Sequence, residues 1–169
     1  MTRLLCLYQG AVYLNTTLIF KDISNEWHFE GLNLEVCENP NAKQLIPIEE
    51  GLNDFNDLMT GMSDRLPLSV LIKSKTNGEV LGGMQGRSSL GLLFIDLFYL
   101  PPELRSKGIG TEILLHFEEE GRRRGCTAAF LYTISFQAPD FYKKHGWEEF
   151  GRIDCKPEGT SRIFMKKSL

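Results

Sequence analysis

The sequence predicts a mixed α/β domain built around a single β-sheet that is flanked by helices. The chain has 169 residues, 42% of them hydrophobic, which suits one domain with one core. Short apolar or alternating runs, typical of strands, recur along it, and residues 108–124 carry apolar side chains at helical spacing. Strands and helices do not alternate regularly, so the order differs from that of a doubly wound fold.

The first 28 residues show no clear period, and we expect them to form an extension packed on a domain that covers residues 29–169. An apolar run at residues 4–20 is interrupted by Gln9, Gly10 and Asn15, and only Arg3 precedes it. These features do not match a signal peptide, and the run is too short and polar to span a bilayer. We therefore expect a cytoplasmic protein with no membrane partner.

The first elements expected in the domain are a strand and a helix. Leu32, Leu34 and Val36 alternate with polar residues, which predicts a strand over residues 29–38. Apolar residues then recur at helical spacing between residues 45 and 58. Pro47 falls inside this stretch, so the helix either begins near Pro47 or bends there.

Three strands and a second helix are expected next. Residues 68–74 and 80–84 read as strands joined by a tight turn at Asn77-Gly78. Residues 92–100 form another apolar run. The helix over residues 108–124 ends with Gly125 as its cap. The rest of the chain predicts a strand at 128–134, a short helix at 139–145 and strands at 148–153 and 162–166.

Charge and cysteine content exclude several classes of function. The net charge is −3, so there is no global basic field to favour DNA. The four cysteines are far apart and the three histidines are not clustered, so the sequence lacks the spacing of a metal site. We expect free thiols and no metal.

The most informative segment is Arg105-Ser106-Lys107-Gly108-Ile109-Gly110, which follows an apolar strand and opens a helix. Free backbone N–H groups and the helix dipole favour anions at such a place, and glycine lets a phosphate approach the main chain. A Walker loop would need Lys-Ser/Thr after the last glycine, where this chain has Thr111-Glu112. A dinucleotide fingerprint would need a third glycine, where this chain has Ile113.

The remaining pattern, R-x-x-G-x-G, resembles the acetyl-CoA pyrophosphate loop of the GNAT acetyltransferases. A second segment, residues 135–147, reads SFQAPDFYKKHGW and resembles the family's block N-x-x-A-x-x-F-Y-x-x-x-G-F. The resemblance covers about residues 30–169. It implies the GNAT fold, whose two central parallel strands splay apart to admit the pantetheine arm of acetyl-CoA.

The resemblance also implies a set of cofactor-binding residues. Ser135 stands where the family has asparagine, so Gln137 is an alternative ligand at this point. The full set expected to bind acetyl-CoA is Phe98, Tyr99, Leu100, Arg105, Ser106, Lys107, Gly108, Ile109, Gly110, Thr111, Ser135, Gln137, Phe141 and Tyr142.

Two residues are candidates for catalysis. Tyr142 matches the family tyrosine that protonates the departing CoA thiolate, the role of a general acid. Asp96 lies inside an apolar strand, where a carboxylate needs a reason because burying it unpaired is costly. It is either a base for the incoming amine or a hydrogen-bonded structural residue. His145 ends the short helix and is expected to cap it.

The expected function is N-acetyl transfer from acetyl-CoA to an amine of a small molecule by direct attack. One alternative is acetylation of a protein lysine, an N-terminus or an aminoacyl-tRNA. Another is a non-catalytic acyl-CoA-binding module. Family members often form dimers, so a homodimer is an option by analogy.

Overall fold

The computed structural model describes residues 18–20, 27–29 and 32–169, with side chains from Leu32 onward. The chain forms two compact units, residues 1–50 and 51–169. In the first unit, β1 (Leu18–Phe20) pairs antiparallel with β2 (Trp27–Phe29), and Ile19 lies opposite His28. The other residues of the expected extension 1–28 lie outside the described residues.

The strand expected over residues 29–38 is wrong for its described part beyond Phe29. Leu32 makes a single isolated bridge, and residues 33–40 have no regular structure. Alternation of apolar and polar residues favours a strand only where a partner supplies the ladder of hydrogen bonds, and the described part of this segment has no such ladder.

Helix α1 (Ala42–Thr60) begins earlier than Pro47. Its start is a reciprocal capping box: Gln44 N–H donates to Asn41 Oδ1 at 3.3 Å, and Asn41 N–H donates to Gln44 Oε1 at 2.9 Å. The helix continues through Pro47. The cap therefore decides where the helix begins, and the proline does not.

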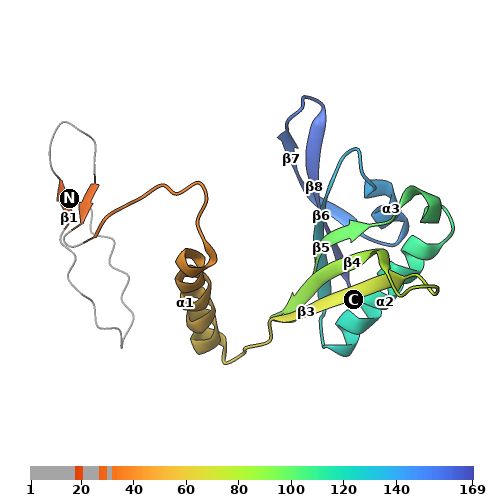
Figure 1. Ribbon diagram of the computed structural model, residues 1–169, viewed down its shortest axis with the longest axis horizontal. Helices are drawn as coiled ribbons and strands as arrows, with labels where there is room; N and C mark the ends of the chain where they lie inside the picture. The colour runs from red at the N-terminus through yellow and green to blue at the C-terminus, as the bar shows by residue number, and fades with distance from the viewer. Residues whose placement is uncertain (1–17, 21–26, 30–31) are drawn as a thin grey trace. The chain divides into compact units, whose positions relative to one another are not determined.

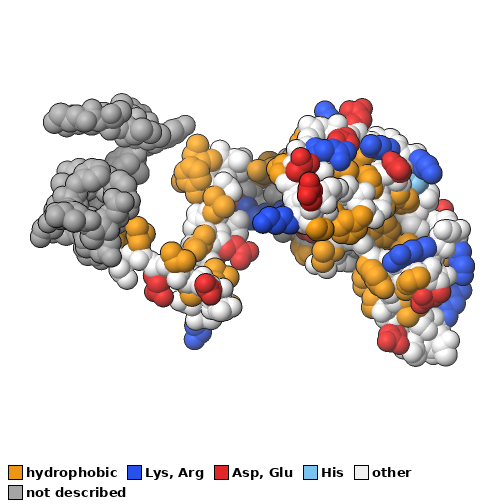
Figure 2. All heavy atoms as spheres, turned by 90° about the horizontal axis from the view of Figure 1, so that it is seen from above, with side chains coloured by type: hydrophobic (Ala, Val, Ile, Leu, Met, Phe, Trp, Pro, Cys, Tyr) orange, Lys and Arg blue, Asp and Glu red, His pale blue; other side chains and the backbone are white. Residues whose placement is uncertain are grey.

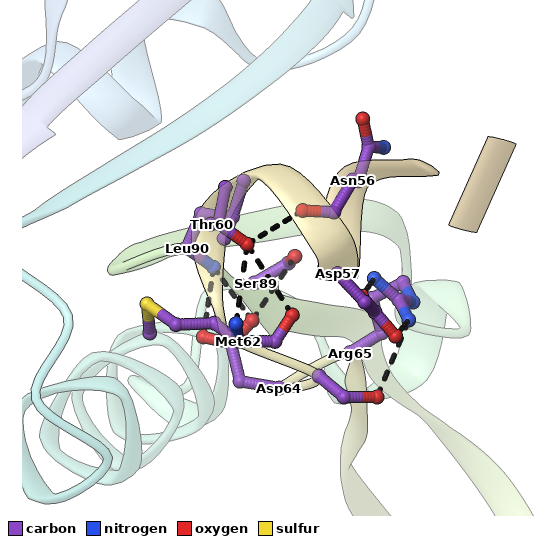
Figure 3. A network of polar contacts seen from close by, with 9 residues as sticks. Asn56, Asp57, Thr60, Met62, Asp64, Arg65, Ser89 and Leu90 are labelled. Carbon is purple, nitrogen blue, oxygen red and sulfur yellow. Dashed lines mark hydrogen bonds and ion pairs between the residues drawn. The ribbon is translucent and has the colours of Figure 1, made fainter. Parts of the chain in front are cut away.

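Within the second unit, a polar network links the last turns of α1 with the segment before the sheet and with a turn of the sheet (Figure 3). Arg65 donates to Asp57 of α1 at 2.6 Å. The Asp64 carboxylate accepts from the Leu90 N–H at 2.8 Å. Leu90 has a φ of +50°, so Asp64 stabilises an otherwise unfavourable turn between two strands.

The second unit contains a six-stranded mixed sheet in the order β3-β4-β5-β6-β8-β7 (Figure 1). This confirms the predicted fold class. The strands are β3 (Leu66–Lys73), β4 (Val80–Ser89), β5 (Leu92–Tyr99), β6 (Ala128–Ile134), β7 (Glu148–Cys155) and β8 (Thr160–Ser168). The turn expected at Asn77-Gly78 is longer than predicted: it spans residues 74–79 and is closed by Ser74 N–H on Glu79 O at 2.8 Å.

Among the described strands of this sheet, only β5 and β6 are parallel neighbours, and they pair along only part of their length. The parallel register runs from Leu92 opposite Ala128 to Ile95 opposite Leu131. Beyond that point β5 stays with β4 and β6 stays with β8. The two central strands therefore separate at their C-terminal ends.

Helix α2 (Ile109–Arg123) packs against β3, β4 and β5, and its apolar side forms the core with them (Figure 1). Leu114 and Phe117 of α2 are fully buried together with Met84 and Leu93 of the sheet. The core therefore lies between this helix and the sheet, which holds the N-terminus of α2 at a fixed place.

A buried carboxylate lies in the middle of α2. Glu118 has no exposed surface. It accepts hydrogen bonds from Trp147 Nε1 at 3.0 Å and from Lys167 Nζ at 2.6 Å. Glu118 thus ties α2 both to β8 and to the turn that follows the short helix α3 (Pro139–Lys144).

The surface of the second unit has no strong charge bias on the face that Figure 2 shows. Basic and acidic side chains are interspersed there with exposed apolar ones. Within the described ranges, no helix is long and apolar enough to cross a membrane.

We expect Glu118→Ala to lower the free energy of unfolding by about 3 kcal/mol, because it leaves the Lys167 charge and the Trp147 N–H without their buried partner. The matched control is Glu119→Ala, whose side chain is 75% exposed and pairs with Arg122 on the surface. That change should cost less than about 1 kcal/mol. Denaturant unfolding measures both, and equal losses would show that the Glu118 contacts do not stabilise the fold.

Candidate active site

A cleft of about 810 Å³ lies at the C-terminal ends of the separating strands β5 and β6. One wall comes from the end of β5 and the loop that leads into α2, and the other comes from β6 and α3. The lining residues are Phe98, Tyr99, Leu100, Arg105, Ser106, Gly108, Gly110, Thr111, Thr133, Phe136, Gln137, Ala138, Phe141, Tyr142 and Lys144. The structure therefore brings together eleven of the fourteen residues expected to bind acetyl-CoA.

The loop before α2 has the backbone of an anion site. Ser106 and Gly108 adopt positive φ values of +58° and +79°, and alternation of this kind turns successive N–H groups toward one concave side. Gly108 is the N-cap residue of α2 and has no capping side chain, so the first N–H groups of the helix are not satisfied by a cap. A negative group in the cleft would fit these donors and the helix dipole.

Arg105 fixes the shape of this loop. Its Nε donates to the carbonyl oxygen of Leu100 at 2.8 Å, which closes the loop across the 3₁₀ turn Pro102–Leu104. The guanidinium also lines the cleft. Arg105 therefore supports the loop as well as adding positive charge beside it.

Gly110 lies where the loop and helix meet aromatic residues of the cleft. A Cβ added at Gly110 would come within 3.4 Å of Leu100 and 3.6 Å of both Phe98 and Phe141. These are ordinary van der Waals distances, so Gly110 packs directly against the apolar part of the cleft lining.

Three of the expected cofactor residues do not line the cleft. Lys107 and Ile109 border a second, shallower hollow of about 370 Å³, together with Val70 and His116. Ser135 instead accepts a hydrogen bond from the Ser161 N–H at 3.1 Å. Gln137 does line the cleft, and its Oε1 accepts from Thr133 Oγ1 and from the Ile134 N–H.

Tyr142 lines the cleft from α3 and is only 6% exposed. Its ring makes edge contacts with Phe141 at 5.2 Å and with Trp147 at 5.8 Å between centroids. Burial raises the pKa of its phenol to about 12, because the apolar surroundings disfavour the phenolate. The hydroxyl is therefore protonated at neutral pH.

Asp96 lies elsewhere on β5 and does not line the cleft. Both carboxylate oxygens accept from Arg87 Nη1, at 2.6 and 2.7 Å, and the Arg87 guanidinium also stacks over Phe94 at 4.5 Å. About 44% of the Asp96 side chain is exposed. The carboxylate thus has a structural partner, and its role as a base stays a prediction.

Sequence reasoning did not name four cleft residues: Thr133, Phe136, Ala138 and Lys144. Thr133 is an inward residue of a predicted strand, and the other three belong to the block of residues 135–147. These residues are close in the sequence to Gln137 and Tyr142, and that closeness could have indicated that they line the same cleft. Among the residues that the structure describes, no cluster of side chains could hold a metal ion.

Comparison with known proteins identifies the family. Residues 32–147 match the acetyltransferase (GNAT) family. The chain therefore belongs to the GNAT family of acetyltransferases, as the two sequence motifs indicate.

Named relatives agree with this assignment. The chain is 29% identical to acetyltransferase Atu2258 of Agrobacterium fabrum, over 80% of this chain and 98% of that protein. It is 32% identical to the blasticidin-S acetyltransferase of Streptomyces morookaense, over 53% of this chain and 68% of that one. The crystal structure of an acetyltransferase from Bacillus cereus aligns with a TM-score of 0.66 at 30% identity, covering 80% of this chain and 98% of that one.

Proposed function

We propose that this acetyltransferase moves an acetyl group from acetyl-CoA to an amine of a small molecule by direct attack. The observation that carries the proposal is the cleft between β5 and β6, which has an anion-binding loop at one side and the buried phenol of Tyr142 at the other. Acetyl-CoA needs both features: donors for its pyrophosphate and a proton for its departing sulfur.

The residues of the cleft suit each part of this donor substrate. The N–H groups at residues 108–111 and the Arg105 charge would hold the pyrophosphate. Phe98, Tyr99 and Leu100 lie beyond the part of β5 that pairs with β6 and line the cleft, so their main-chain groups would bind the pantetheine amides. A backbone N–H on this edge would also stabilise the oxyanion of the tetrahedral intermediate.

Tyr142 would complete the reaction. The amine nitrogen attacks the thioester carbonyl, a C–N bond forms, and the C–S bond then breaks. The sulfur leaves with the electron pair and takes the proton of the Tyr142 hydroxyl. The phenol is protonated at neutral pH, so its proton is present when the C–S bond breaks, and the amine's released proton restores the phenol.

A small-molecule acceptor is favoured over the alternatives. The relative from Streptomyces morookaense is named for blasticidin-S, which is a small molecule. Protein, peptide or aminoacyl-tRNA acetylation and a non-catalytic binding module remain alternatives. A screen for CoA release across polyamines, aminoglycosides, amino acids and peptides separates them: turnover with peptides alone would contradict the small-molecule assignment, and binding without release would favour the module.

We expect saturating acetyl-CoA to raise the melting temperature by about 5–10 °C, because ligand at 100 times its dissociation constant stabilises the native state by about 2.7 kcal/mol. Gly108→Val should remove most of this rise by blocking approach to the main chain. Gly125→Val is a matched control, since Gly125 has a similar φ of +81° at the other end of α2 and open space around its Cβ. Equal rises in the two folded variants would show that the loop assignment is wrong.

Tyr142→Phe should lower the rate of acetyl transfer about 10²–10⁴-fold, the usual loss for a positioned general acid. Acetyl-CoA affinity should hardly change, because the ring and its packing remain. Steady-state kinetics measure the loss, which should shrink for an acetyl thioester with a better leaving group. Tyr132→Phe is the control, since Tyr132 lies outside the cleft lining. A fully active, folded Tyr142→Phe variant would contradict the assignment.

If Asp96 is the base, Asp96→Asn should lower turnover most at low pH, where unprotonated amine is scarce. Arg87→Gln breaks the same ion pair but keeps the carboxylate, so it separates the two roles. The pH dependence of kcat/KM provides the measurement. Parallel losses of stability in both variants with an unchanged pH profile would assign Asp96 a structural role.

A further inference from the structure

Next to the loop of residues 105–110, the side chains of Thr111 and His145 form a hydrogen-bonded pair, and the proposed reaction gives His145 no role. Thr111 lies in the first turn of α2 and lines the cleft. Its Oγ1 is 3.0 Å from Nε2 of His145, the C-cap residue of α3. The other ring nitrogen, Nδ1, is 2.7 Å from the carbonyl oxygen of Phe141. Both nitrogens of the half-buried imidazole are therefore engaged.

The chemistry of these partners decides where the protons lie. A carbonyl oxygen can only accept, so Nδ1 carries a proton whether the ring is neutral or charged. In a neutral ring Nε2 is then a bare acceptor, and the single proton of the Thr111 hydroxyl points to it. The hydroxyl then presents only lone pairs to the cleft.

An anion in the cleft reverses this arrangement. A phosphate oxygen beside Thr111 can bond to the hydroxyl only if the hydroxyl donates, which leaves a neutral Nε2 facing the lone pairs of Oγ1. A protonated ring resolves the conflict: Nε2–H donates to Thr111, and Thr111 donates to the anion. The hydrogen bond from His145 to Thr111 and the one from Thr111 to the anion then both have their donors pointing toward the negative charge.

We propose that His145 is a positioning residue for the pyrophosphate of CoA, and that CoA binding takes up a proton on His145. This inference rests on the proposed function, because it needs CoA in the cleft. It adds a linkage that the acetyl transfer does not require: CoA binds more tightly when the imidazole is charged.

Several charged side chains lie near the His145 imidazole and act on any charge that it carries. Arg105 and Lys144 line the same cleft as Thr111. Lys143 forms an ion pair with Glu149 of β7, with 3.5 Å between Nζ and Oε2. The other charged residues close to Thr111 and His145 in the sequence are Lys107, Glu112, Asp140 and Glu148. Phosphate charges would offset the nearby cations, which favours the imidazolium in the complex.

Calorimetric titration of CoA into the full chain tests the inference. Titrations at one pH in buffers of different ionisation enthalpy give the number of protons taken up, and titrations between pH about 6 and about 8 cover the range in which an imidazole loses its proton. His145→Gln keeps a polar side chain that cannot take up the proton. His116→Gln is the matched control, because His116 also hydrogen-bonds a backbone carbonyl, that of Glu112, from the same helix as Thr111.

The parent and His116→Gln should take up more protons than His145→Gln, and their CoA affinity should fall about tenfold over this pH range, the worth of one charged hydrogen bond. His145→Gln should show a clearly smaller fall. The ionisation of CoA itself is common to all three proteins and cancels in the comparison. If His145→Gln does not fold, His145→Asn takes its place.

Equal proton uptake and equal pH dependence in the parent and His145→Gln would overturn the inference, even if the variant binds CoA more weakly at every pH. That result would leave the proposed function intact. Absence of CoA binding by the parent would overturn both together.

Discussion

The site depends on the point at which β5 leaves β6. Parallel pairing stops after Ile95 and Leu131, and a β-bulge lies at the same place. On the β4 side, Gly86 lies opposite Ile95 while its neighbour Gln85 lies opposite Leu97, so Asp96 is the extra residue. A bulge bends its strand and increases the local twist. It carries the end of β5 away, while β6 remains in register with β8 to Ile134.

Close backbone packing holds this bulge in place. A Cβ at Gly86 would lie 1.8 Å from the carbonyl oxygen of Phe94 and 3.0 Å from the ring of Phe117. Only glycine therefore lets β4 follow β5 so closely on this side. Phe117 belongs to α2, so the same packing also fixes the helix whose N-terminus forms the anion loop. The opening and the loop are consequences of one packed arrangement.

Much of this arrangement could be predicted from the sequence, because its signals are local. Gly108 and Gly110, between a predicted strand and a predicted helix, indicate the position of the loop of residues 105–110. The block of residues 135–147 around Tyr142 indicates the opposite wall of the cleft. The bulge at Asp96 could not be predicted, because residues 92–100 read as an uninterrupted apolar strand with one acid. The ion pair with Arg87 depends on the register between β4 and β5, which no local pattern contains. The same limit explains Ser135, which bonds to Ser161 of β8 and not to the cleft.

We propose that the opening between β5 and β6 holds acetyl-CoA with its sulfur at Tyr142. A crystal structure of the chain with CoA tests it most directly. We expect pyrophosphate oxygens on the N–H groups of residues 108–111, the pantetheine arm between the two strands, and the sulfur within hydrogen-bonding distance of the Tyr142 hydroxyl. CoA bound outside this opening, or a sulfur remote from Tyr142, would contradict it.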